Sequence, residues 1–196
     1  ANVEDLLKLK CNGSDVTVES ALQEKILTIG ENIKIRRFER LEGDLITYTH
    51  GDGRISVMVK FDTDVAKKDA FDEYAKDVAM QIAAVAPQYL EESEIPAEVV
   101  TKEKEILTVQ AMNEGKPAAI AEKMVVGRIK KFFKEICLVD QAFVKDNEKT
   151  IAQYTESVAK ELSGSIKIVK FVRFEKGEGI EKRVDNFADE VASMAK

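Results

Sequence analysis

Residues 44–61 read DLITYTHGDGRISVMVKF, which is the clearest hairpin pattern in the chain. Two runs of alternating character flank Gly51-Asp52-Gly53, a turn rich in residues that tolerate positive φ. In the second run the apolar residues occupy every other position, namely Ile55, Val57, Val59 and Phe61. Such alternation directs one face of a strand toward a core. The stretch therefore predicts an antiparallel hairpin with strands at about Leu45–His50 and Arg54–Phe61.

Two similar segments lie on either side of this hairpin in the chain. Residues 32–44 read NIKIRRFERLEGD, and residues 165–179 read SIKIVKFVRFEKGEG. Chance is one explanation, because alternation recurs in unrelated strands; internal duplication is the other, and the glycine-bearing ends of both segments favour it. We therefore expect an α+β fold with two similar units: the first has two helices and a strand, and the second has the hairpin, helices and a strand. In the second subdomain, Ile166–Phe174 should pair with the hairpin.

Helical periodicity fills much of the remaining chain. Thr17 can cap a helix that Gly30 ends, and a long amphipathic helix is predicted for Ala70–Ala86, just before Pro87. Residues 149–162 predict another helix, and residues 184–195 predict a last amphipathic one.

Residues 90–138 predict an inserted helical hairpin. Two long amphipathic segments are separated only by the break at residues 115–117, so the helices should be antiparallel. Their apolar stripes hold more large aliphatic residues than two helices can hide from each other, so we expect self-association through this arm. The residues expected to mediate it are Val99, Ile106, Val109, Ile120, Met124 and Ile129.

These elements predict a domain organisation. Residues 1–44 form the remainder of the first core subdomain, and residues 45–89 with 139–185 form the second. Residues 90–138 form the arm, and residues 186–196 a C-terminal helix. The chain begins without Met inside a helical pattern, so we expect a fragment or a processed product.

Composition limits the function classes. The chain has 196 residues, 44% of them hydrophobic, and a net charge of −6, which disfavours direct binding of nucleic acid. We expect no membrane span, because no apolar run is long enough. Cys11 and Cys137 are far apart in sequence and are expected to be reduced thiols of a cytoplasmic protein.

No catalytic constellation is found. His50 is the single histidine, which rules out histidine pairs and a Ser-His-Asp set, and there is no phosphate-binding loop motif. We expect neither an enzyme, nor a cofactor, nor a metal site. Residues 128–136, RIKKFFKEI, fit either an RNA contact or the wet face of a packed helix, and the second reading is favoured. His50 at a loop tip is either plain surface or a binding residue.

Several blocks resemble one known family. IGENIKIRRFERLEGD (29–44), YTHGDGRISVMV (48–59) and GKPAAIAEKMVVGRIKKFFKEICLVDQAFVKD (115–146) are similar to translation elongation factor Ts, and the similarity extends from about Val18 to Met194. The resemblance implies a core of two similar α/β subdomains, each with a small antiparallel sheet and helices, and an inserted dimerisation hairpin. It also implies a guanine-nucleotide exchange factor that binds elongation factor Tu in its GDP-bound and nucleotide-free forms and disturbs its magnesium and phosphate-loop region.

The resemblance carries over to particular positions. It implies that Ile29, Gly30 and Asn32, where the helix meets the next segment, face the partner, together with His50 and Gly51 at the hairpin tip. The family's N-terminal domain and its Thr-Asp-Phe-Val motif are expected to be missing. Residues 61–71 echo that motif without its Phe, so no role is transferred. The alternative function is a protein-interaction or scaffold module that binds without speeding nucleotide release.

Overall fold

The computed structural model describes residues 2–66, 68–115 and 117–180. The chain forms two compact units, the first ending at Glu42 and the second beginning at Gly43. Each unit is described by itself below. The expected helix over residues 184–195 lies outside the described residues.

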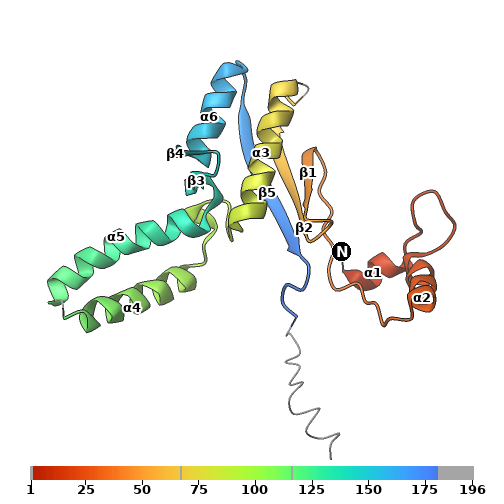
Figure 1. The fold of residues 1–196 in the computed structure, drawn as a ribbon, viewed down its shortest axis with the longest axis horizontal. Helices are drawn as coiled ribbons and strands as arrows, with labels where there is room; N and C mark the ends of the chain where they lie inside the picture. The colour runs from red at the N-terminus through yellow and green to blue at the C-terminus, as the bar shows by residue number, and fades with distance from the viewer. Residues whose placement is uncertain (1, 67, 116, 181–196) are drawn as a thin grey trace, which may run out of the picture. The chain divides into compact units, whose positions relative to one another are not determined.

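The first unit is built on two helices, α1 (Val3–Lys8) and α2 (Val18–Ile29) (Figure 1). Thr17 caps α2 by accepting a hydrogen bond from the Ser20 backbone N–H, and Gly30 ends it in the left-handed conformation with φ 77°. Both caps were predicted from the sequence. Helix α2 buries none of its residues fully.

The strand predicted within residues 32–44 is wrong for residues 32–42. These residues form no strand, and the first unit's only described pairing is an isolated bridge between Lys10 and Thr17. The physical reason is that alternation alone does not make a strand; the backbone also needs a neighbouring strand to accept its hydrogen bonds. The described part of the first unit offers none, so the sheet expected there is absent from it.

The second unit contains the predicted hairpin and its third strand. β1 (Asp44–His50) pairs antiparallel with β2 (Ile55–Thr63), which pairs antiparallel with β5 (Ile166–Glu175). The strand order is β1-β2-β5. Ile55 lies opposite His50 on one side and Glu175 on the other. The prediction that residues 166–174 join the hairpin is confirmed.

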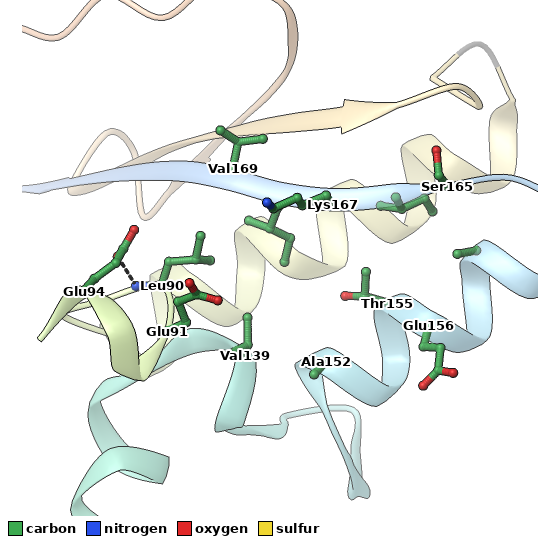
Figure 2. A pocket seen from close by; sticks show the side chains of 13 residues that line it. Leu90, Glu91, Glu94, Val139, Ala152, Thr155, Glu156, Ser165, Lys167 and Val169 are labelled. Carbon is green, nitrogen blue, oxygen red and sulfur yellow. Dashed lines mark hydrogen bonds between the residues drawn. The ribbon is translucent and has the colours of Figure 1, made fainter.

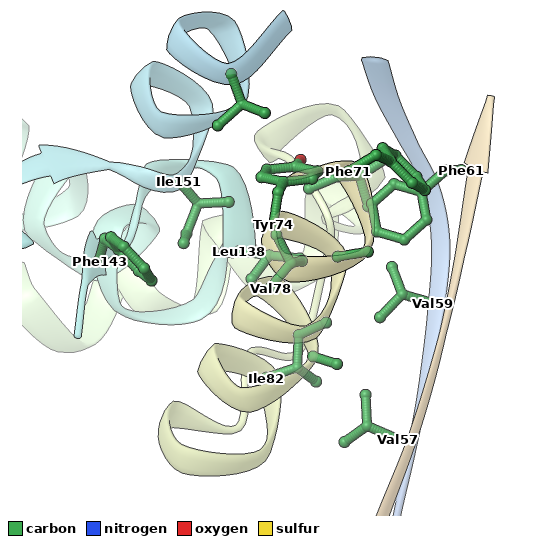
Figure 3. Close-up of a cluster of buried hydrophobic side chains, with 14 of the residues drawn as sticks. Val57, Val59, Phe61, Phe71, Tyr74, Val78, Ile82, Leu138, Phe143 and Ile151 are labelled. Atoms are coloured by element: carbon green, nitrogen blue, oxygen red, sulfur yellow. The ribbon is translucent and has the colours of Figure 1, made fainter. Parts of the chain in front are cut away.

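Helix α3 (Asp69–Val85) packs on one face of this sheet, as Figure 3 shows. Its buried residues recur at helical spacing, and the buried residues of β2 alternate, so the two apolar faces meet. The fully buried core residues include Val59, Tyr74, Val78, Ile82, Leu138 and Ile151. The helix ends at Val85, and the next residue, Ala86, caps it with φ 52° just before Pro87.

The remaining elements complete an α+β fold, as predicted. The arm is α4 (Ala97–Asn113) and α5 (Ala118–Ile136), which lie side by side in Figure 1. The other elements are η1 (Glu92–Glu94), η2 (Leu138–Asp140), β3 (Ala142–Phe143), β4 (Asp146–Thr150) and α6 (Ile151–Glu161). Sequence reasoning missed the β3–β4 pair. None of the helices described is long and apolar enough to span a lipid bilayer.

The interior and the exposed side of the arm are distinct. Leu107, Val125 and Ile129 form a buried cluster between its helices. Ile129 is only 6% exposed, so it belongs to the arm's interior and is not available to a partner. Val99 and Met124 are half-buried. The exposed large apolar residues of the arm are Ile106, Val109, Met112, Ile120 and Val126.

Candidate partner-binding site

The tip of the β1–β2 hairpin is a tight turn with an unusual backbone. Gly51, Asp52 and Gly53 have φ values of 58°, 52° and 87°, and the Arg54 N–H donates to the Gly51 carbonyl at 3.0 Å. Glycine adopts positive φ at little cost, and Asp tolerates it better than most residues. The GDG sequence therefore allows the chain to reverse directly after His50, which is exposed.

His50 is held by a neighbour on its own strand. Tyr48 and His50 are two residues apart in β1, so their side chains leave the same face of the sheet. The Tyr48 hydroxyl lies 3.0 Å from Nδ1 of His50, and the ring centroids are 6.0 Å apart. Tyr48 is half-buried and packs against the main core. The exposed imidazole is thereby tied to an anchored ring.

A hollow of about 450 Å³ opens beside these two rings. Its lining comes from three parts of the second unit: the hairpin, the C-terminal half of α3 and the β3–β4 turn. The lining residues are Tyr48, His50, Ile55, Met80, Ala83, Ala84, Val144 and Lys145. Most of them are apolar, and the polar groups lie at His50, Tyr48 and Lys145. Such a hollow is suited to an apolar side chain flanked by a hydrogen-bonding group.

The wall formed by the β3–β4 turn is fixed by a buried glutamine. Gln81 on α3 is fully buried, and its Oε1 accepts a hydrogen bond from the Val144 N–H at 2.9 Å. Its Nε2 lies 3.1 Å from the Ala142 carbonyl and 3.2 Å from Oε1 of Gln141, and donates to both. One side chain thus satisfies a backbone carbonyl of β3 and the backbone N–H that follows β3.

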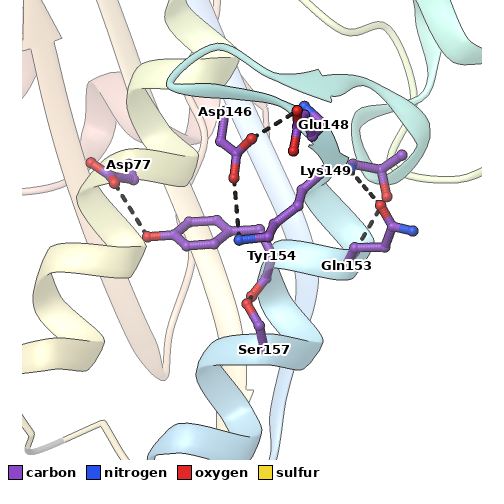
Figure 4. A network of polar contacts seen from close by, with 8 residues as sticks. Asp77, Asp146, Glu148, Lys149, Gln153, Tyr154 and Ser157 are labelled. Atoms are coloured by element: carbon purple, nitrogen blue, oxygen red, sulfur yellow. Dashed lines mark hydrogen bonds and ion pairs between the residues drawn. The ribbon is translucent and has the colours of Figure 1, made fainter.

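Asp77, one turn before Gln81 on α3, holds the next residue of the same wall. Its carboxylate accepts from Lys145 Nζ at 2.6 Å and from the Tyr154 hydroxyl at 3.2 Å; Figure 4 shows the Tyr154 contact. Asp77 is 7% exposed, so these donors compensate a buried charge. Burial and the Asp77 charge raise the pKa of Tyr154 to about 12, so its hydroxyl remains a donor to Asp77 even in mildly alkaline solution.

The structure places the other expected partner-facing residues in the first unit. Ile29 ends α2 and is 58% exposed, and Gly30 and Asn32 follow it and are also exposed. His50 and Gly51 lie together at the hairpin tip of the second unit. Sequence reasoning missed Tyr48 and the residues from α3 and the β3–β4 turn. Only Tyr48 left a signal, because it precedes His50 by two positions in an alternating run.

A second, larger hollow of about 610 Å³ lies near the start of β5 (Figure 2). It is lined by α6, by residues 165–169 and by Leu90, Glu91, Glu94 and Val139. Glu94 accepts a hydrogen bond from the Leu90 N–H at 2.8 Å. The strand register separates the two hollows, since Ile166 pairs with Thr63 at the end of β2 remote from the hairpin tip.

Reactive groups elsewhere are few among the residues that the structure describes. These residues contain no cluster of three metal-ligating side chains. Cys137 is fully buried, and burial together with nearby carboxylates raises the pKa of its thiol to about 11. Cys11 is half-buried, and the two thiols are not joined in a disulfide.

The fold is therefore that of an α+β protein with a small antiparallel sheet, an inserted helical arm and an exposed hairpin tip. Comparison with known proteins identifies the family of the chain. The family model described as "Elongation factor TS" matches residues 1–178. The chain belongs to the elongation factor Ts family.

Individual relatives are similar over nearly the whole chain. It is 53% identical over 195 residues to the elongation factor Ts of a Clostridium perfringens strain. It is 48% identical over 195 residues to that of a Clostridium botulinum strain, and in both cases 98% of this chain is covered. It is 49% identical over 193 residues to that of a Clostridium kluyveri strain, with 96% covered. The chain spans about 64% of the length of the first two relatives and 63% of the third.

Proposed function

We propose that this chain acts as a guanine-nucleotide exchange factor for elongation factor Tu, with the tip of the β1–β2 hairpin as one of its contacts. Membership of the elongation factor Ts family supports the partner and the activity. The single observation that supports the site is the exposed His50, held by Tyr48 beside an apolar hollow.

Exchange of this kind needs no covalent step. A factor that prefers the nucleotide-free partner weakens GDP binding by the same factor by which GDP weakens binding of the exchange factor, because linkage is reciprocal. The chain has only to hold the partner's phosphate and magnesium loops in a conformation that fits GDP poorly. A hairpin tip that continues a packed sheet is suited to this task, because the sheet restrains the position of the tip when the partner binds.

The arm supplies the second part of the proposal. Ile106, Val109, Met112 and Ile120 are large aliphatic residues that are 43–56% exposed on two adjacent helices. Apolar surface of this kind is typical of a contact with another protein. We propose that it mediates self-association of the chain.

The test of the activity is a stopped-flow measurement of fluorescent GDP release from elongation factor Tu. We expect the chain, in excess, to raise the release rate above the spontaneous rate at fixed magnesium concentration. The rise should be saturable in chain concentration and should fall as magnesium is increased, since magnesium stabilises bound GDP.

A parallel binding measurement separates the two functions considered. Isothermal titration of the chain into nucleotide-free and GDP-bound elongation factor Tu should give tighter binding to the nucleotide-free form. Equal affinities for the two forms, without faster GDP release, would identify an interaction module instead. A ligand that binds both forms equally well does not shift the equilibrium between them.

A further inference from the structure

We infer that Tyr48 is a positioning residue: its hydroxyl donates to Nδ1 of His50 and so presents Nε2–H as a hydrogen-bond donor to an acceptor on the partner. This inference rests on the proposed function for its partner, but its first half concerns this chain alone. The geometry that carries it is the 3.0 Å separation between the Tyr48 hydroxyl and Nδ1, which brings the two groups into hydrogen-bond contact. The direction follows from their chemistry, because a phenol O–H is a stronger donor than a neutral imidazole N–H, and an imidazole nitrogen is a stronger acceptor than a phenol oxygen.

The first step is that the imidazole needs a fixed orientation. His50 is exposed at the end of β1, directly before a turn, so its ring is not enclosed by the core. An exposed ring that rotates freely loses rotamer entropy on binding, and a ring restrained beforehand loses less. A hydrogen bond from an anchored neighbour provides that restraint.

The second step is that Tyr48 is itself anchored. It lies opposite Val57 in the hairpin register, and Val57 is 3% exposed within the main core. Tyr48 packs against the same core, so its hydroxyl emerges at a defined place beside the hollow. The bond to His50 therefore joins an exposed imidazole to a side chain that packs against the core.

The third step concerns which nitrogen carries the proton. In a neutral imidazole one nitrogen is a donor and the other an acceptor, and the bond made by one decides the role of the other. With Nδ1 accepting from the Tyr48 hydroxyl, Nε2 carries the proton. The ring then offers a donor next to an apolar hollow, which fits a partner segment with an apolar side chain beside a backbone carbonyl or a carboxylate.

The hollow provides the space for that apolar side chain. Ala83 and Ala84 line it from α3, and their small side chains leave room that a Leu or Met there would fill. Val144 and Lys145 close the far side and are fixed by Gln81 and Asp77. The hydrogen bond and the apolar contact would then be made by adjacent groups of one partner segment.

The first experiment reads the ring of His50 by nuclear magnetic resonance. The chain has one histidine, so imidazole ¹⁵N signals come from His50 alone. In the unaltered chain, at a pH where the ring is neutral, we expect the Nε2–H tautomer to dominate. In Tyr48→Phe, which keeps the packed ring and removes the hydroxyl, the signals should move toward tautomer averaging. Tyr89→Phe, which removes a hydroxyl outside this hollow, should leave them unchanged.

The second experiment is a double-mutant cycle on binding to nucleotide-free elongation factor Tu. Tyr48→Phe should weaken binding about three- to tenfold in the unaltered chain and should have no further effect in a His50→Ala background, because it acts only through His50.

The outcomes separate this inference from the proposed function. Tautomer signals that do not respond to Tyr48→Phe would overturn the positioning role, whatever the partner does. A weakened affinity that persists in the His50→Ala background would overturn it as well, since Tyr48 would then act independently. If Tyr48→Phe changes the tautomer but neither Tyr48→Phe nor His50→Ala changes the affinity, the hairpin tip is not a contact. The proposed site is then wrong, and so is the hydrogen bond inferred from Nε2 to the partner.

Discussion

Replacing Gln81 by Leu should destabilise the second unit and loosen one wall of the hollow. Leu has a similar size but offers no partner for the Val144 N–H and the Ala142 carbonyl, which Gln81 contacts at 2.9 and 3.1 Å. Each net hydrogen bond contributes about 0.5–1.5 kcal/mol, and a buried group left unsatisfied costs about 1–3 kcal/mol. These two groups are partly buried, whereas Oε1 of Gln141, 3.2 Å from Nε2 of Gln81, is buried and also loses its donor. The apolar contact that Leu adds offsets part of this loss. We expect a loss of about 2 kcal/mol.

Urea unfolding followed by circular dichroism measures the global loss, and amide hydrogen exchange measures the local one. We expect the protection of the Val144 amide to fall more than that of amides in the middle of β2. Gln110→Leu is the matched control, because Gln110 is exposed on α4 and surface changes there should stay within about 0.5 kcal/mol. If Gln81→Leu unfolds at the same urea concentration as the unaltered chain and keeps Val144 protected, the role assigned to Gln81 is wrong.

Three further predictions follow from single sites. Gly164→Ala should destabilise the fold by at least about 1 kcal/mol, because a Cβ there would overlap the Val65 side chain. Gly127→Ala on α5 places its Cβ in open space and should stabilise the fold by about 0.5–1 kcal/mol. Thermal melts of the two variants should therefore shift in opposite directions. Val109→Asp should weaken self-association of the arm, measured by sedimentation, because Val109 is 56% exposed. Burial raises the pKa of the Cys137 thiol from 9.0 to about 11, so the folded state holds this proton more tightly than the unfolded chain. The free energy of unfolding should therefore fall as pH rises from 9 to 11, and Cys137→Ala should make this fall smaller.

Each of these has an outcome that would contradict it. A melting temperature of Gly164→Ala equal to that of the unaltered chain would show that the close approach at Gly164 relaxes at no cost. A monomer at high micromolar concentration for the unaltered chain would remove self-association through the arm. A slope of stability against pH that Cys137→Ala leaves intact would assign it to other groups, of which Tyr154 is one, since its pKa is raised to about 12.

The parts of the fold that were predicted depend on local signals. The GDG turn, the alternation of β2 and the repeat at residues 165–179 were enough to place β1, β2 and β5 in one sheet. The two caps of α2 were also predicted, because Thr17 and Gly30 form hydrogen bonds with residues three or four positions away in the chain. The same alternation gave a wrong strand prediction for residues 32–42, where the described part of the first unit provides no strand partner.

The parts that were not predicted depend on contacts between distant residues. The β3–β4 pair is short, its second strand has the polar sequence DNEKT, and its geometry is set by Gln81 about 60 residues earlier. A buried glutamine in a helix gives no sign of its partners in the sequence. His50 could be placed at an exposed tip, but the hollow beside it appears only when α3 and the β3–β4 turn are brought together.

The rate of GDP release from elongation factor Tu, measured with the unaltered chain and with His50→Ala, tests the proposed exchange activity and its site together. A contact residue of this kind contributes about 1–2 kcal/mol, and 1.4 kcal/mol corresponds to about tenfold. We therefore predict that His50→Ala lowers the stimulated rate roughly tenfold at subsaturating chain concentration, with an unchanged thermal melt. His50→Gln, which keeps a donor near the position of Nε2, should recover much of the loss. Stimulation by His50→Ala equal to that of the unaltered chain would contradict the account.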